Sequence, residues 1–333
     1  MIILSTKTTG DMKLFKPEIT DGVYNVIGDQ LPTNFDIIDD TITNMKSGIV
    51  QSNPNLLING DFRIWQRGTF LYAKNADYTA DRWQLGGGFQ VTSDRRGLKM
   101  TKQSGISNYP VQLTQNIEIS NHLSEKTMTF SFIVHCTSEQ PLKNVIYSIN
   151  LNTTNSSIVR GEYEITNTPQ LISVTFKTPS FLSPSISIMP FSTTTSNVET
   201  NQSVYINNVK LEIGDKVTPF SPRPYAEELM LCQRYYEPIT RGYRGVGVTL
   251  SDGSFIIDYP FLVQKRRSPT QFPLDTIDAL RMYPTNTVIT PDELKVHMST
   301  LGARFFGVAR SFPNSIMSLN FETYADADLW WNN

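Results

Sequence analysis

MTFSFIV, residues 128–134, places an apolar side chain at every second position, and this stretch decides the fold class. A period of two is typical of a strand that buries one face. Similar runs recur between residues 55 and 220, at 89–92, 111–119, 145–151, 171–176, 186–189 and 204–211. Asn, Ser, Thr, Pro and Gly fill the gaps, as turns require. About eight antiparallel strands of this kind predict a mainly β fold built around a jelly-roll sandwich.

The chain is long enough for two or three folded units. It has 333 residues, whereas a domain usually has about 100–200. We expect an attachment segment with a short helix at 1–52, the jelly roll at 53–222, a connector helix at 223–240 and a β-sandwich tip at 241–333.

The charge balance argues against polyanionic partners. Lys and Arg total 29 and Asp and Glu total 31, which leaves a net charge of −2. We therefore predict no nucleic-acid binding. No stretch approaches the ~20 apolar residues of a membrane-spanning helix, and residues 1–16 lack the pattern of a secretory signal. We accordingly expect no membrane insertion.

The residues that most often carry catalysis or metals are few and scattered. Cys136 and Cys232 each stand alone, so they predict neither a disulfide framework nor a metal site. His122, His135 and His297 lie in no catalytic motif, and a structural role is the simpler interpretation of His135. The sequence predicts no catalytic residue, metal or cofactor, and hence no enzyme.

Two apolar seams suggest an oligomer. The first has spacings of 4, 3, 4, 3 and 4, typical of a coiled coil, and consists of Leu31, Phe35, Ile38, Ile42, Met45 and Ile49. The second, in the connector, consists of Tyr225, Leu229, Cys232 and Tyr236. The alternative for the first seam is an amphipathic helix that packs against its own chain.

Three blocks of sequence carry a resemblance to a known family. They are NLLINGDFRIWQRGT at 55–69, YTADRW at 78–83 and VKLEIGDKVTPFSPRPYAEELMLCQRYY at 209–236. They resemble the start and end of a carbohydrate-module-like β-sandwich in bacteriophage tail fibres and receptor-binding proteins. Within them, Trp65 and Trp83 are expected to plug the sandwich. The side chains expected to cap or bridge its edges are Asp61, Arg63, Asp81 and Arg82.

The resemblance implies a homotrimeric tail fibre, made in the bacterial host cytoplasm and carried on the virion. Its N-terminal segment would attach to a tail or baseplate protein, and its distal domain would bind host cell-surface polysaccharide without chemistry. A structural tail or baseplate component that binds no receptor is the main alternative. A glycan depolymerase is a third, less favoured because the chain shows no internal repeat.

Sugar binding calls for aromatic faces beside amides, carboxylates or guanidinium groups. In the tip, the candidates for this chemistry are Tyr243, Arg244, Asp252, Tyr283, Asn286, Trp330 and Trp331. Packing in the core or between chains is the alternative for each.

Overall fold

The computed structural model divides the chain into two compact units, Met1–Asn53 and Pro54–Asn333. It describes residues 34–36, 38, 52–73, 77–105, 110–118, 123–151, 158–180, 185–239, 245–269, 280–282, 287–289, 292–311, 314, 316–319 and 323–327. In the first unit, residues 34–36 and 38 are helical. All of the strands described below belong to the second unit.

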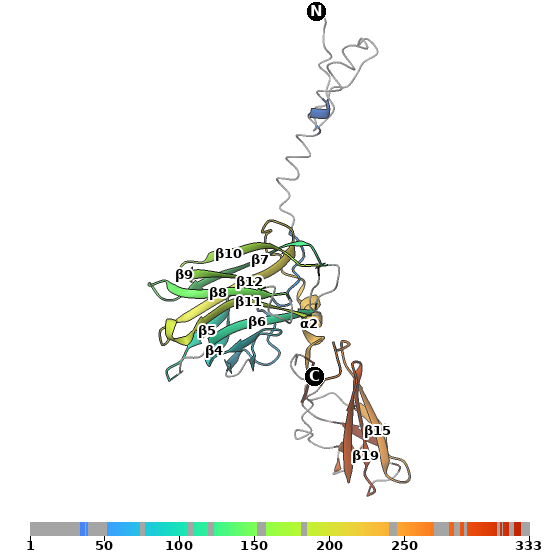
Figure 1. The fold of residues 1–333 in the computed structure, drawn as a ribbon. Helices are drawn as coiled ribbons and strands as arrows, with labels where there is room; N and C mark the ends of the chain where they lie inside the picture. Colours follow the sequence, from blue (N-terminus) through green and yellow to red (C-terminus); the bar gives the residue numbers. More distant parts are fainter. Residues whose placement is uncertain are drawn as a thin grey trace, which may run out of the picture. The chain divides into compact units, whose positions relative to one another are not determined.

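Two six-stranded antiparallel sheets form the sandwich, with their strands in two layers (Figure 1). The first sheet has the order β1 (Phe70–Ala73), β4 (Phe89–Asp94), β5 (Gly97–Lys102), β12 (Ser203–Ile213), β7 (Thr127–Cys136), β10 (Gln170–Lys177). The second has the order β2 (Asp77–Tyr78), β3 (Gln84–Gly86), β6 (Pro110–Glu118), β11 (Ser185–Thr194), β8 (Leu142–Asn150), β9 (Ile158–Ile165). The 3-10 turn η3 (Thr195–Asn197) joins β11 to β12. The predicted mainly β fold with a sandwich is confirmed.

The core of the sandwich explains the alternating pattern. In β7, Phe130, Phe132 and Val134 are fully buried between the two sheets. Trp83 is also fully buried, and its ring lies 5.1 Å from that of Phe62. Each large side chain removed from water in this way stabilises the fold by about 1.5–3 kcal/mol.

Helix α2 (Tyr225–Gln233) follows the sandwich and is shorter than the predicted connector at 223–240. Residues beyond the helix form strand β13 (Tyr236–Ile239), which pairs antiparallel with β21 (Thr323–Asp326). Tyr236 therefore lies in a strand and does not continue the helical seam. Its preference for extended backbone is satisfied by pairing with the far end of the chain.

Two small sheets complete the C-terminal region. One has the order β14 (Gly245–Val248), β20 (Ile316–Leu319), β16 (Leu280–Met282), β17 (Thr287–Ile289). The other, which we call the tip sheet, has the order β15 (Ser254–Pro260), β19 (Gly302–Val308), β18 (Glu293–Met298). One face of the tip sheet is buried through Phe255, Ile257, Tyr259 and Phe305. The tip is therefore β-rich, as predicted.

The seam residues have mixed positions. In the first seam, Phe35 and Ile38 are helical, and the Phe35 side chain is exposed. Leu31, Ile42, Met45 and Ile49 lie outside the described residues.

In the second seam, Tyr225 is exposed and Leu229 is half-buried, but Cys232 and Tyr236 are buried within their own chain. These last two side chains are therefore not available to a neighbouring chain, which corrects their assignment to a seam. Among the described residues, no helix has the length and apolar character needed to span a membrane.

Candidate functional site

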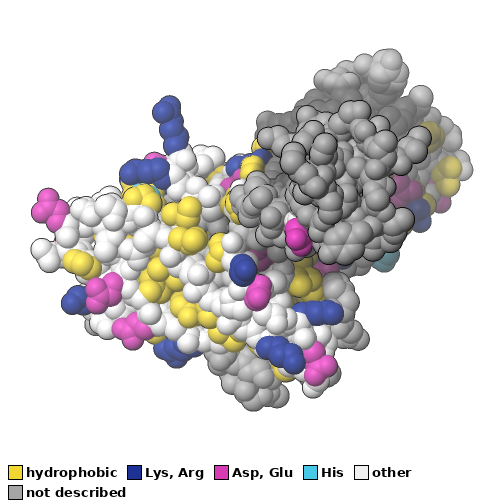
Figure 2. Space-filling view, turned by 90° about the horizontal axis from the view of Figure 1, so that it is seen from above, with side chains coloured by type: hydrophobic (Ala, Val, Ile, Leu, Met, Phe, Trp, Pro, Cys, Tyr) yellow, Lys and Arg dark blue, Asp and Glu magenta, His cyan; other side chains and the backbone are white. Residues whose placement is uncertain are grey.

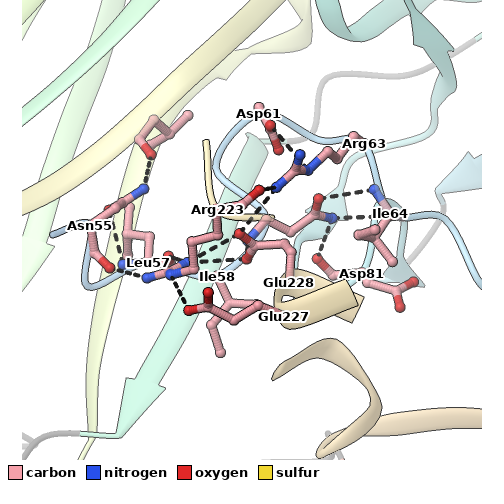
Figure 3. A network of polar contacts seen from close by, with 12 residues as sticks. Asn55, Leu57, Ile58, Asp61, Arg63, Ile64, Asp81, Arg223, Glu227 and Glu228 are labelled. Carbon is pink, nitrogen blue, oxygen red and sulfur yellow. Dashed lines mark hydrogen bonds and ion pairs between the residues drawn. The ribbon is translucent and has the colours of Figure 1, made fainter. Parts of the chain in front are cut away.

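Glu228 of helix α2 forms hydrogen bonds that connect the helix to residues 55–64 at the start of the sandwich (Figure 3). Its carboxylate is buried and accepts a hydrogen bond of 2.6 Å from the backbone N–H of Asn59. The guanidinium of Arg223 donates to both carboxylate oxygens, at 3.1 and 3.2 Å. Arg63 approaches the same carboxylate to 3.8 Å. A buried charge of this kind is tolerated because it is both paired and hydrogen-bonded.

Two asparagines join the sequence blocks that are far apart in the chain. Asn55 donates from Nδ2 to the carbonyl of Val209 at 2.9 Å. Asn59 donates from Nδ2 to the carbonyls of Ile64 and Asp81, at 2.9 and 3.0 Å. The three blocks singled out by resemblance therefore meet at one junction.

Gly60 shows how closely these blocks approach. Its carbonyl accepts a hydrogen bond from the N–H of Val209 at 2.8 Å. A Cβ at position 60 would lie 2.1 Å from the carbonyl oxygen of Val209. Only glycine fits this contact between the opening block and strand β12.

The structure places the aromatic and charged residues of the resembling blocks in different environments. Trp83 fills the core, whereas Trp65 is only half-buried and packs against it. Asp81 accepts the backbone N–H of Gln66 at 2.9 Å, and Arg82 donates to a backbone carbonyl of strand β6. The predicted core role is confirmed for Trp83 and the bridging role for Asp81 and Arg82, whereas Trp65 packs at the edge of the core.

Arg67 links the sandwich to the end of the chain. Its guanidinium lies 4.6 Å from the ring centre of Tyr78 and 3.7 Å from that of Tyr236. It also donates to the carboxylate of Asp326 at 3.1 Å. Cation–π and ionic contacts thus hold the β13–β21 pair against the sandwich.

The outward face of the tip sheet is the part of the described chain best suited to a ligand. Strand pairing places Ile256 opposite Phe306, and Phe306 opposite Lys295. Two residues further along, it places Asp258 opposite Arg304, and Arg304 opposite His297. Side chains of directly paired residues share a face, so the sheet presents an apolar row beside a polar one.

The polar row borders a hollow of about 500 Å³, which we call the polar hollow. Its lining includes Asp258, His297, Ser299, Leu301 and Arg304. Arg304 donates to the Asp258 carboxylate through two parallel hydrogen bonds, of 2.7 and 2.9 Å. These bonds lower the pKa of Asp258 and raise that of Arg304, so both groups are charged at neutral pH.

The polar hollow offers donors and acceptors together. Asp258 and Arg304 are exposed, which leaves their outer edges free to exchange hydrogen bonds with a hydroxylated molecule. The Leu301 side chain is 65% exposed and supplies an apolar flank. Polar groups beside an apolar flank suit a sugar ring, which has hydroxyls at its edge and C–H groups on its face.

Among the predicted glycan ligands, Asp252 is the one within the described residues, and it has a local role. It lies in the turn before β15 and accepts the N–H and the hydroxyl of Ser254, at 2.9 and 2.7 Å. These bonds lower the pKa of Asp252. Tyr243, Arg244, Tyr283, Asn286, Trp330 and Trp331 lie outside the described residues.

Sequence reasoning did not select Asp258, His297 or Arg304. The sequence does indicate that the Asp258 side chain is exposed, because it occupies a solvent-facing position in the alternating strand Ser254–Pro260. Its partner Arg304 lies 46 residues away, and pairing between strands so far apart in the chain cannot be derived from alternation alone.

The face in Figure 2 shows hydrophobic, basic and acidic side chains interspersed. His135 stacks on Tyr205 with ring centres 4.6 Å apart, which confirms its predicted structural role. In the described part of the chain, no group of three His, Cys, Asp or Glu is placed to hold a metal ion.

No protein-family model matches the chain, and no curated protein matches it. Several solved structures are similar over about half of it. A structure described as "CBM4 structure and function" has 18% identity and a TM-score of 0.32, covering 47% of this chain and 98% of its own. TmCBM61 in complex with beta-1,4-galactotriose has 14% identity and a TM-score of 0.33, covering 48% and 99%.

A third similar structure is the enzymatically active domain of bacteriophage CBA120 tailspike protein 4. It has 14% identity and a TM-score of 0.33, and the match covers 48% of this chain and 21% of that one. These similarities are distant. The sandwich is assigned from its own strand pairing, and no activity is transferred from these proteins.

Proposed function

We propose that this chain is a non-enzymatic adhesion protein of a bacteriophage tail or a tail-like particle. In this proposal it is a homotrimer that attaches through residues 1–52 to a tail or baseplate protein. Its C-terminal region binds a glycan on the host cell surface, and the assembled protein is carried on the virion. The N-terminal seam supports the oligomer, and the three resembling blocks support the context.

The polar hollow is the observation that carries the binding part of the proposal. Asp258 and Arg304 are held to each other on a sheet by two parallel hydrogen bonds, which lowers the side-chain entropy that a ligand would cost on binding. His297 and Ser299 line the same hollow and add further polar groups. A single site of this kind is weak, but several copies on one particle gain avidity.

The test is retention of the full-length protein on immobilised host polysaccharide. The variants Asp258→Asn and Arg304→Gln should each reduce retention about tenfold or more, because a lost charged hydrogen bond costs about 1.5–3 kcal/mol. Lys143→Gln is a matched control, since Lys143 forms an exposed ion pair with Glu164 on the sandwich. Equal retention of all three variants would contradict the assignment of the site.

Three further measurements separate the alternatives. Release of reducing sugar from host polysaccharide would indicate a depolymerase in place of a binding protein. No retention of the native protein, together with its incorporation into particles, would favour a structural tail or baseplate component. Light scattering on the full-length protein tests the trimer, which a clean monomer at micromolar concentration would contradict.

A further inference from the structure

The tip sheet exposes an apolar row beside the polar hollow. Phe306 lies opposite Ile256 in β15, and Val248 extends the row because Thr249 pairs with Phe255 next to it. The exposed fractions are 52% for Val248, 57% for Ile256 and 36% for Phe306. All three line a second hollow, of about 460 Å³. Lys295, which pairs with Phe306, ends the row with a positive charge.

A second row runs parallel to the first, two residues along each strand. It begins at Leu250, which is 61% exposed, and continues through Ser254 and Val308. It ends at Glu293, which pairs with Val308 and whose carboxylate also forms an exposed ion pair with the Lys295 ammonium of the same chain. The two rows therefore have the same order of residue types, with an aliphatic residue at one end and a charged residue at the other. The two charged residues have opposite sign.

This arrangement of the two rows allows the surface to pack against the same surface of a second copy. In a face-to-face contact, a second copy can be related to the first by a two-fold axis that lies in the interface, perpendicular to the strands and midway between the two rows. Lys295 of one copy then faces the partner's Glu293. The same operation brings Phe306 against the partner's Val308, and Val248 against the partner's Leu250, while Ile256 lies over the partner's Ser254. A two-fold contact needs this kind of match, because each residue i must suit the residue j that it meets.

We propose that this surface, formed by the two rows and called the apolar face below, packs against the apolar face of a second copy of the chain. The contact removes four exposed large apolar side chains of each copy from water, which is the expected source of its affinity. Lys295 and Glu293 at the rim set the orientation and disfavour parallel pairing. The proposal does not rest on glycan binding, but the contact would border the polar hollow, because Arg304 lines both hollows. A two-fold contact joins two tips, so it adds to a three-fold assembly by pairing the tips of different trimers.

The first test measures the mass of the full-length protein by light scattering over a range of concentrations. The native protein should show a step in which the mass doubles, and the double variant Ile256→Ser with Phe306→Ser should lose that step. Leu171→Ser is the matched control, because Leu171 is 57% exposed on the sandwich strand β10. The same mass at every concentration for native protein and double variant would overturn the proposal.

The second test exchanges charges at exposed positions; each single variant also replaces the ion pair between Glu293 and Lys295 within the chain by two like charges. Glu293→Lys alone and Lys295→Glu alone should each weaken the doubling step about tenfold, because two symmetry-related pairs become repulsive. The combined variant E293K/K295E should restore it. Circular dichroism checks that each variant is folded. Loss of the step in the single variants without recovery in the combined one would overturn the end-for-end orientation.

Discussion

The backbone N–H of Asn59 donates a hydrogen bond to the carboxylate of Glu228, 169 positions further along the chain. Both residues are buried, and the same carboxylate receives the guanidinium of Arg223 (Figure 3). The start of the sandwich and the helix that leaves it are thereby joined at one charged group. The sequence blocks at 55–69 and 209–236 act as one structural unit because of this junction.

Replacing Glu228 by Gln should therefore lower the stability of the sandwich. The change keeps the shape of the side chain but removes the charge that Arg223 and Arg63 face. We expect the free energy of unfolding in urea to fall by about 2 kcal/mol, the cost of losing a buried charged hydrogen bond. Glu227→Gln is the matched control, because Glu227 is exposed and lies 3.8 Å from Arg223. It should change stability by less than about 0.5 kcal/mol, and equal effects of the two variants would refute the junction.

The fold of this region could be predicted from the sequence, whereas the junction could not. Alternation in residues 128–134 marks a half-buried strand because the pattern depends only on neighbours in the chain. The hydrogen bond between Asn59 and Glu228 depends on how two segments far apart in the chain pack together. A local sequence pattern contains no information about such packing. The helix prediction for residues 223–240 failed at its end for the same reason, since pairing with β21 turns residues 236–239 into a strand.

A second buried charge pair lies after the helix and predicts an unequal response to single and double changes. Lys265 and Glu237 are both buried and hydrogen-bonded to each other. The Lys265 ammonium also donates to the carbonyls of Gln233 and Val263, at 2.7 and 3.0 Å. It therefore connects the end of α2 to the segment that follows β15.

Lys265→Met should cost about 3–5 kcal/mol of unfolding free energy, because it leaves the Glu237 carboxylate buried without a counter-charge. The double variant Lys265→Met with Glu237→Met should recover most of that loss, since no buried charge remains. Chemical unfolding of the three proteins gives the values. A double variant that is less stable than Lys265→Met would show that the two residues do not act as a pair.

Arg67 predicts a local effect at the end of the chain. A lysine at position 67 keeps the positive charge beside Asp326 but has no planar group to stack on Tyr78 and Tyr236. We expect Arg67→Lys to raise amide hydrogen exchange in β13 and β21, by about fivefold for a loss of about 1 kcal/mol, and to leave β7 unchanged. Arg95→Lys, at an exposed position of the sandwich, serves as the control. Unchanged exchange in both strands would contradict the link.

The site in the tip shows where sequence reasoning stops. Asp252 was selected because it lies in a polar loop, but its carboxylate is used to hold Ser254 in the turn. Nothing in the sequence distinguishes Asp258 from other carboxylates on strands, which usually face only water. Its value as a ligand group comes from Arg304, which the β15–β19 register brings opposite to it.

Two carboxylates of the sandwich predict opposite dependences of stability on pH. Burial raises the pKa of Asp61 above 3.8, although Arg63 lies 3.3 Å away. The folded state therefore binds its proton more tightly, and the stability that Asp61 contributes is lost as the pH rises from 3.8 through the folded pKa. Hydrogen bonds from Arg96 lower the pKa of Asp94, so its contribution is present above 3.8 and is lost as the pH falls through the folded pKa.

Substitution by asparagine should separate the two groups. At pH 7, Asp61→Asn should leave the free energy of unfolding unchanged or raise it, because a buried charge that opposes folding is removed. Asp94→Asn should lower it, because the carboxylate that accepts the N–H of Arg96 is lost. Urea unfolding between pH 3 and 7 measures both slopes. A fall in stability at pH 7 for Asp61→Asn as large as that for Asp94→Asn would mean that the ion pair with Arg63 outweighs the burial of Asp61.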